Sequence, residues 1–143
     1  MTITHKYAAY KALDARFREH PDTPAYSDYV DPRNKPPYYH YFWTGGGEVN
    51  NLNDSHQAEH VFIVKAVTTS MDAAFVAEAN LVTWFDDMGT QDVTTGYLDA
   101  GTDWTITATM QEGAIHQVVQ RAANTTQEYH DGFYLRILMG RIT

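Results

Sequence analysis

The chain has 143 residues, enough for a core of its own, and we expect residues 1–143 to form a single domain. It contains no cysteine, which excludes disulfides, thiolate metal sites and cysteine nucleophiles. The formal net charge of −8, from 18 acidic and 10 basic residues, argues against sequence-specific nucleic-acid binding, because proteins hold phosphates with clustered Lys and Arg.

The N-terminal segment carries no basic-then-apolar leader, and no apolar run reaches the about 18 residues of a membrane span. We therefore expect a protein that is made and kept soluble. Apolar residues at steps of three and four then predict an amphipathic helix that Pro21 ends just beyond His20. The predicted stripe consists of Ile3, Tyr7, Tyr10, Leu13 and Phe17. Residues 21–37 hold all five prolines and predict turns and extended segments that wrap a surface.

Residues 38–44 are rich in aromatic side chains and predict a strand, which three glycines then interrupt. We expect Gly45, Gly46 and Gly47 to form a flexible hairpin tip and residues 45–57 to form a polar loop. A phosphate-binding loop is not indicated, because Glu48 and Val49 follow the glycines where Lys and Ser or Thr would open a helix.

The chain is organised around residues 59–88, which predict a strand that leads directly into a helix. β-Branched and aromatic residues fall on both alternating faces of residues 59–68, so we expect a central strand covered on both sides. Thr69 or Ser70 stands where the helix needs an N-cap, and Gly89 stands where it would end. The predicted apolar face comprises Ala74, Ala77, Leu81, Trp84 and Met88, broadened by Phe75, Val82 and Phe85.

Two further strands are predicted near the C-terminus, at residues 104–110 and 133–139, where apolar residues alternate with others. The segment 113–127 between them suits either a short helix or the two arms of one long hairpin. We favour the hairpin, with Gly113 placed to form a bulge. The predicted fold is therefore α+β, with two helices on a mostly antiparallel sheet of about four strands in the order α-β-β-α-β-β.

The most specific chemical motif is His56-Gln57-Ala58-Glu59-His60, which matches the H-x-x-E-H pattern of one class of zinc metalloprotease. That chemistry needs both histidines one turn apart on a helix, so that they meet on one Zn²⁺. Here the motif leads into a predicted strand, where positions i and i+4 lie roughly 13 Å apart. We therefore expect no metal, no cofactor and no catalytic residue, and we keep a small metal-dependent hydrolase using His56 and His60 as a rival hypothesis.

Two places are predicted to contact partners. The glycine- and asparagine-rich loop offers little apolar area to bury, so its ordering requires a partner. Its residues are Gly45, Gly46, Gly47, Glu48, Val49, Asn50, Asn51, Leu52, Asn53 and Asp54. Asp86 and Asp87 lie at the predicted helix end, where the helix dipole disfavours anions, and this position predicts a cation from elsewhere.

The arrangement of elements resembles the siphophage tail terminator (tail completion) family over nearly the whole chain. The similarity is carried by the short first helix, the Pro36-Pro37-Tyr38-Tyr39 lead-in, the polar loop, the strand at 60–67, the helix at 71–87 and the closing segment 129–137. No individual functional residue carries over, because the match lies in the layout.

The resemblance implies a virion protein that forms a ring, of six copies in the family, on the head-proximal end of a bacteriophage tail. Such a ring ends polymerisation of the tail tube protein and offers a surface to the head-tail connector protein, after assembly in the host cytoplasm. An acidic chain suits a ring through which DNA passes without sticking. Another head-tail connector or minor tail component of similar fold is the nearer alternative.

Overall fold

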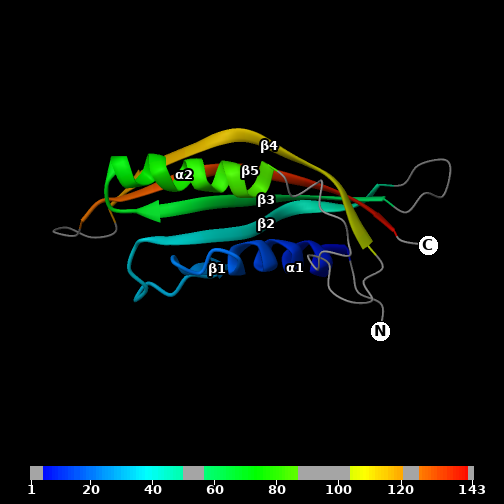
Figure 1. Cartoon of the computed structure of the whole chain (residues 1–143), viewed down its shortest axis with the longest axis horizontal. Coiled ribbons are helices and arrows are strands. Elements are labelled where there is room, and N and C mark those ends of the chain that lie inside the picture. Colours follow the sequence, from blue (N-terminus) through cyan, green and yellow to red (C-terminus); the bar gives the residue numbers. More distant parts are fainter. Residues whose placement is uncertain (1–4, 50–56, 87–103, 121–125, 142–143) are drawn as a thin grey trace.

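The computed structural model describes residues 5–49, 57–86, 104–120 and 126–141, which form a five-stranded mixed sheet and two helices (Figure 1). The α+β class and both predicted helices are confirmed. In chain order the elements are α1 (His5–Arg18), β1 (Ala25–Ser27), β2 (Tyr38–Val49), β3 (Gln57–Thr68), α2 (Met71–Asp86), β4 (Trp104–Val119) and β5 (Glu128–Arg141).

The strands lie in the order β1-β2-β3-β5-β4, so the predicted central position of β3 is correct. All neighbours are antiparallel except β1 and β2, which run parallel. The sequence analysis missed β1, which lies in the proline-rich segment. This strand forms only because β2 offers its edge: the Tyr39 N–H donates to the Pro24 carbonyl and the Asp28 N–H to the Tyr41 carbonyl, each at 2.9 Å.

Both helices lie on one face of the sheet and share a single core with it. The Phe17 ring from α1 lies 5.3 Å from the Phe85 ring of α2, and both cover strand residues such as Phe62 and Leu135. Along β3 the residues of this face are fully buried, whereas the intervening residues 59, 61, 63 and 65 stay partly exposed. The expectation that β3 is covered on both sides is therefore wrong for the helices described, which cover one face.

The buried face of α1 matches the predicted stripe only in part. Its buried residues are Ala8, Ala9, Ala12, Leu13, Arg16 and Phe17, whereas Tyr7 is half exposed. Three alanines let the helix lie close to the sheet, a position that larger side chains would prevent. The prediction is therefore correct for Leu13 and Phe17 and wrong for Tyr7, and Ile3 lies outside the described residues.

The helix α2 begins as predicted and its N-cap is Ser70 rather than Thr69. The Ser70 hydroxyl accepts the Ala73 N–H at 3.2 Å, and the Ser70 carbonyl accepts the Ala74 N–H at 3.0 Å. Leu81 and Phe85 are fully buried against the sheet. Met88 and Gly89, predicted to end the helix, lie outside the described residues.

β4 and β5 pair as the two arms of the long hairpin, and the alternative of a short helix is wrong for residues 113–119, which belong to β4. Trp104 lies opposite Arg141, and the register shifts between Glu112 and Ala114. Gly113 sits in this bulge with a φ of 63°, a left-handed conformation that favours glycine. Residues 121–125, between β4 and β5, lie outside the described residues.

Candidate assembly surfaces

The three consecutive glycines do not form a hairpin tip. β2 continues through them to Val49 and pairs with β3, Gly45 opposite Val61 and Val49 opposite Gln57. Gly46 has a φ of 138°, and a Cβ on it would lie 2.1 Å from the Glu59 carbonyl oxygen. The glycine therefore permits a close approach of the two strands, a reason that the pattern of residues alone did not reveal.

The candidate contact loop is correspondingly shorter than predicted. Gly45 to Val49 belong to β2, so the prediction of a loop over residues 45–57 is wrong. Asn50, Asn51, Leu52, Asn53 and Asp54 lie outside the described residues. Asp86 is the last residue of α2. Asp87 lies outside the described residues.

The H-x-x-E-H motif enters a strand, as its sequence context predicted. His60 and Glu59 are consecutive strand residues, so their side chains point to opposite faces of the sheet. His60 is buried on the helix side, whereas Glu59 forms an ion pair with Arg136 on the other side. His56 lies outside the described residues. This arrangement does not bring the glutamate and His60 to one metal.

Both ring nitrogens of His60 are engaged within the chain. Its Nδ1 accepts the indole N–H of Trp43 at 2.9 Å, which places its proton on Nε2, 2.6 Å from the His5 Nδ1. Burial, together with repulsion from His5 and Lys6, lowers the pKa of His60 to about 4. The imidazole is therefore neutral at pH 7 and acts as a buried junction between α1, β2 and β3.

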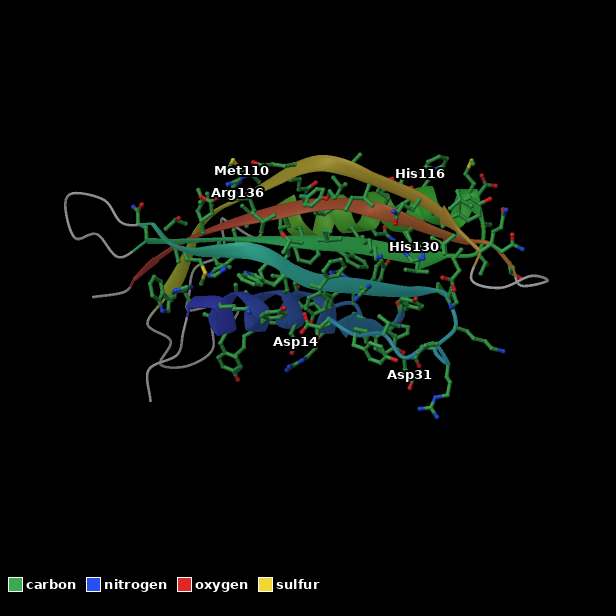
Figure 2. All side chains as sticks on the ribbon, turned by 180° about the vertical axis from the view of Figure 1, so that it is seen from behind. Asp14, Asp31, Met110, His116, His130 and Arg136 are labelled. Atoms are coloured by element: carbon green, nitrogen blue, oxygen red, sulfur yellow. The ribbon has the colours of Figure 1, made fainter. Side chains whose placement is uncertain are left out.

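The face of the sheet opposite the helices is a mixed apolar and charged surface (Figure 2). Phe42, Ile63 and Tyr134 lie side by side across β2, β3 and β5, because the register pairs Phe42 with Ile63 and Ile63 with Tyr134. Tyr134 is 40% exposed and Met110, on β4, is 42% exposed. No described helix covers this surface, which we call the open sheet face.

An ion network crosses one half of the open sheet face. Arg136 on β5 bonds Glu112 on β4 through two contacts of 2.9 and 3.0 Å and also pairs with Glu59 on β3. The three side chains are 30% to 43% exposed, so solvent screening limits the network to about 1 kcal/mol per pair. The network links three neighbouring strands and neutralises the charge of Arg136 locally.

A hollow of about 340 Å³ lies in the other half of the open sheet face. We call it the sheet hollow; its lining residues are Phe42, Ile63, Lys65, Ala114, Ile115, His116, Gln117 and Tyr134. Gly132 pairs with both Lys65 and Ile115, so a residue without a side chain stands between them. A Cβ on Gly132 would lie 2.0 Å from the Val64 carbonyl oxygen, which requires glycine at this position.

The outer side of α2 exposes a row of large residues. Met71, Phe75, Glu78 and Val82 follow one another at steps of four, three and four, so they lie along one side of the helix. Met71 is 48% exposed, Phe75 55% and Val82 41%, and Glu78 is partly buried among them. We call this row the α2 stripe. The sequence analysis assigned Phe75 and Val82 to the core, and this assignment is wrong.

Next to the α2 stripe, β4 and β5 carry a buried acidic group. Asp131 is fully buried and accepts a hydrogen bond from His116 Nδ1 at 2.5 Å, while its Oδ2 atom has no hydrogen-bond partner. Burial, followed by repulsion from Asp131, raises the pKa of Glu78. Among the described residues no group of three or more His, Asp or Glu side chains is arranged to hold a metal ion.

A second hollow of about 390 Å³ opens between the first turns of α2 and the start of β2. Tyr38, Tyr39 and Ala66 form its apolar wall, and Asp72 and Asn80 form part of its rim. Tyr39 is buried, with its ring 5.2 Å from the Trp84 ring. It serves the core rather than an exposed stacking surface.

The sequence analysis did not identify the exposed apolar residues of α2 as a surface. The signal available was that α2 is apolar on more than one side, since Val76 is 64% exposed in addition to the stripe. A helix that is apolar beyond the face its own sheet can cover indicates a second contact.

Neither a scan against models of known families nor a search of curated proteins matches this chain. No helix among the described residues is long and apolar enough to cross a membrane.

Proposed function

We propose that this chain is a structural assembly protein of the tail-terminator type. It caps the head-proximal end of a phage tail tube as a ring of identical copies, ends tail polymerisation and offers a surface to the head-tail connector. The proposal rests on the family resemblance in the order of elements. The structural observation that supports it best is the presence of exposed apolar side chains on two opposite sides of the sheet, in the α2 stripe and on the open sheet face.

Two different exposed apolar surfaces on one chain favour a head-to-tail contact between copies. In such a contact the α2 side of one copy meets a different surface on the next, and the repeat closes into a ring when the rotation permits. A two-fold dimer, by contrast, uses the same surface twice and leaves the other exposed. Exposed apolar area of this kind is costly in water, so covering it stabilises the assembly.

The charge of the chain suits the same role. A net charge of −8 repels DNA, so a ring made of this protein would let the genome pass without holding it. The nearer rival, another connector or minor tail component, would use similar surfaces but would not stop tube growth. The rival hydrolase would require His60 to give up its bonds to Trp43 and His5.

The proposal is tested by mixing the purified protein with growing tubes of the cognate tail tube protein and imaging them by electron microscopy. We expect closed rings at one tube end and tubes of limited length. Capping is scored on tubes because a tube end acts as a template for the ring. Tubes that grow without limit and carry no ring at any protein concentration would contradict the proposal.

A matched pair of variants makes this test specific. Phe75→Ser removes the most exposed aromatic residue of the α2 stripe and should abolish capping without changing the melting temperature, because its ring is 55% exposed. Tyr29→Ser removes an aromatic side chain that is 76% exposed elsewhere. This control should cap normally, and equal loss of capping in both variants would count against the α2 stripe as a contact.

A further inference from the structure

β4 forms one edge of the sheet, and the described strands pair with it on one side only (Figure 1). An edge strand presents backbone N–H and C=O groups that a further strand can bond, and proteins usually prevent this with Lys, Pro, a bulge or a covering segment. At the opposite edge, β1 covers part of β2, and the Trp43 N–H that follows bonds the Tyr10 hydroxyl. That edge is therefore protected by the chain itself.

The second half of β4 lacks these protective features. Both register shifts of the strand precede Ala114, and its one charged residue, Glu112, also lies before that point. Residues 114–119, which we call the β4 edge, pair with β5 without interruption and contain no Asp, Glu, Lys, Arg or Pro. Three of the six, Ile115, Val118 and Val119, are β-branched. A short uncharged segment of this composition readily accepts another strand.

The outward backbone groups of the β4 edge follow from the register. In an antiparallel ladder a residue directs its N–H and its C=O to the same side, and the side alternates along the strand. Tyr39 and Tyr41 direct theirs toward β1. The register carried across β3 and β5 then leaves Ile115, Gln117 and Val119 bonded to β5. The residues that direct their N–H and C=O outward are therefore Ala114, His116 and Val118.

We propose that the β4 edge pairs with the β4 edge of a second copy, as an antiparallel ladder across a two-fold axis. The contact goes beyond the proposed ring and does not depend on it. An antiparallel edge is self-complementary, because each outward residue offers one donor and one acceptor and a two-fold rotation places the same pattern opposite it. The ladder joins the sheets of the two copies into one continuous sheet and covers Val118, which is 49% exposed in the single chain.

Charge favours this place for a contact between copies. Two copies with a net charge of −8 repel one another, and the repulsion is weakest where neither contact surface carries a charged side chain. Pairing two α2 helices would instead bring carboxylates together, because α2 contains three acidic residues and no Lys or Arg. The one ionisable side chain of the β4 edge is His116, whose Nδ1 bonds Asp131 of its own chain at 2.5 Å. A second uncharged edge is therefore the occupant that an acidic protein accepts here.

Sedimentation equilibrium of the purified protein tests the contact without tail tubes. We expect a reversible monomer–dimer equilibrium whose Kd rises at least tenfold in Val118→Lys, because a lysine on an edge strand opposes pairing. Val76→Lys is the matched control, since it makes the same substitution on α2 at a site that is 64% exposed, and it should dimerise like the parent. A parent protein that stays monomeric up to about 1 mM, or equal weakening by both variants, would overturn the proposal. Circular dichroism confirms that each variant is folded.

Disulfide cross-linking determines the symmetry of the contact, because the chain has no cysteine of its own. Ile115→Cys, Gln117→Cys and an equimolar mixture of the two are oxidised mildly. A disulfide requires Cα atoms about 4.4 to 6.8 Å apart. Across a two-fold axis near the middle of the β4 edge, one of the three pairings meets this requirement, and the others are displaced along the strand by about 7 Å or more. We therefore expect strong linking in one pairing and weak linking in the other two.

The pattern of linking decides the outcome. Strong self-linking at both positions would indicate parallel pairing and would overturn the two-fold ladder. Linking no stronger than that of Arg33→Cys with itself would show that the two edges do not meet; the native Arg33 side chain is 91% exposed. Because neither measurement uses tail tubes, a failure here leaves the proposed function standing, and a failure to cap tubes leaves this contact standing.

Discussion

The Tyr10 hydroxyl completes the edge of β2 where the short strand β1 ends. It accepts the Trp43 N–H at 3.2 Å and donates to Asp28 Oδ1 at 2.6 Å, so an outward-facing strand donor is satisfied by a helix side chain. Burial and the bond to Asp28 raise the pKa of Tyr10 to about 12, which keeps it a donor at neutral pH. Sequence analysis placed Tyr10 in an apolar stripe, because the strand that it completes was not visible there.

Among single residues, Gly46 has a strict steric requirement, and we predict that Gly46→Ala strongly destabilises the fold. The φ of 138° and the 2.1 Å approach to the Glu59 carbonyl leave no room for a methyl group. We expect a loss of about 2 kcal/mol or more in the free energy of unfolding, measured by urea denaturation. Gly47→Ala is the matched control, since a Cβ there meets nothing within 4 Å, and its stability should change by less than about 1 kcal/mol. Equal effects would contradict the strand pairing through the glycines.

His60 makes stability depend on pH. Its folded-state pKa of about 4 lies below the unfolded value of 6.5, so the unfolded chain takes up a proton first as the pH falls. The stabilisation is fully present above pH 6.5 and is lost progressively down to about pH 4. The loss should be of the order of 1–3 kcal/mol.

Two-dimensional NMR of the imidazole groups checks this prediction. One histidine should remain neutral below pH 5, and its signal should be missing in His60→Gln. If every histidine of the parent protein titrates above pH 6, the buried junction of His60 with Trp43 and His5 is wrong.

At the scale of elements, α2 is defined by its cap and by two apolar sides. Ser70→Ala removes the hydroxyl that accepts the Ala73 N–H and should cost about 1 kcal/mol. Thr69→Ala, one residue earlier, should change the free energy of unfolding by less than about 0.5 kcal/mol, because surface changes away from such features have small effects. Thermal or urea unfolding of the two variants decides which residue is the cap, and a larger effect at Thr69 would reverse the assignment.

The sequence largely predicted which segments form helices and strands, but it did not predict which of their residues are buried and which are exposed. The strand and helix predicted at residues 59–88, of which the structure describes 59–86, followed from local signals: alternation, a capping Thr69 or Ser70 and an apolar face. The same apolar signal could not separate Phe85, which is buried, from Phe75, which is exposed. Both residues suit an apolar side of a helix, and only the position of the sheet determines which of them it covers.

At the scale of the whole molecule, two helices on one face leave the other face of the sheet available for a partner. The connection between β2 and β3 is residues 50–56, because Val49 already pairs with Gln57. Replacing residues 50–56 with Asn-Gly should leave the fold intact, since loop length changes closure entropy by only about 0.6 kcal/mol per doubling. If this segment is an assembly contact, the shortened protein should melt cooperatively near the parent's temperature but leave tails of irregular length.

The outcome of this loop replacement is read in two steps. Calorimetry first shows whether the shortened protein still unfolds in one transition. Electron microscopy of tubes then measures their length. Normal capping by the folded, shortened protein would remove residues 50–56 from the assembly contact, and loss of the fold would show that they are needed for the hairpin itself.

By itself, the sequence determined the fold class, both helices, the central strand and the hairpin of β4 and β5 with its bulge at Gly113. These features depend on periodicity, caps and glycine geometry, which are properties of neighbouring residues. Three features emerged only from the packing of distant segments: β2 runs through the glycines, a three-residue strand forms at its edge, and the described helices leave one face of the sheet open. Those features depend on which surfaces meet, and pairing between distant segments overrides local propensity because it satisfies backbone hydrogen bonds that no local signal specifies.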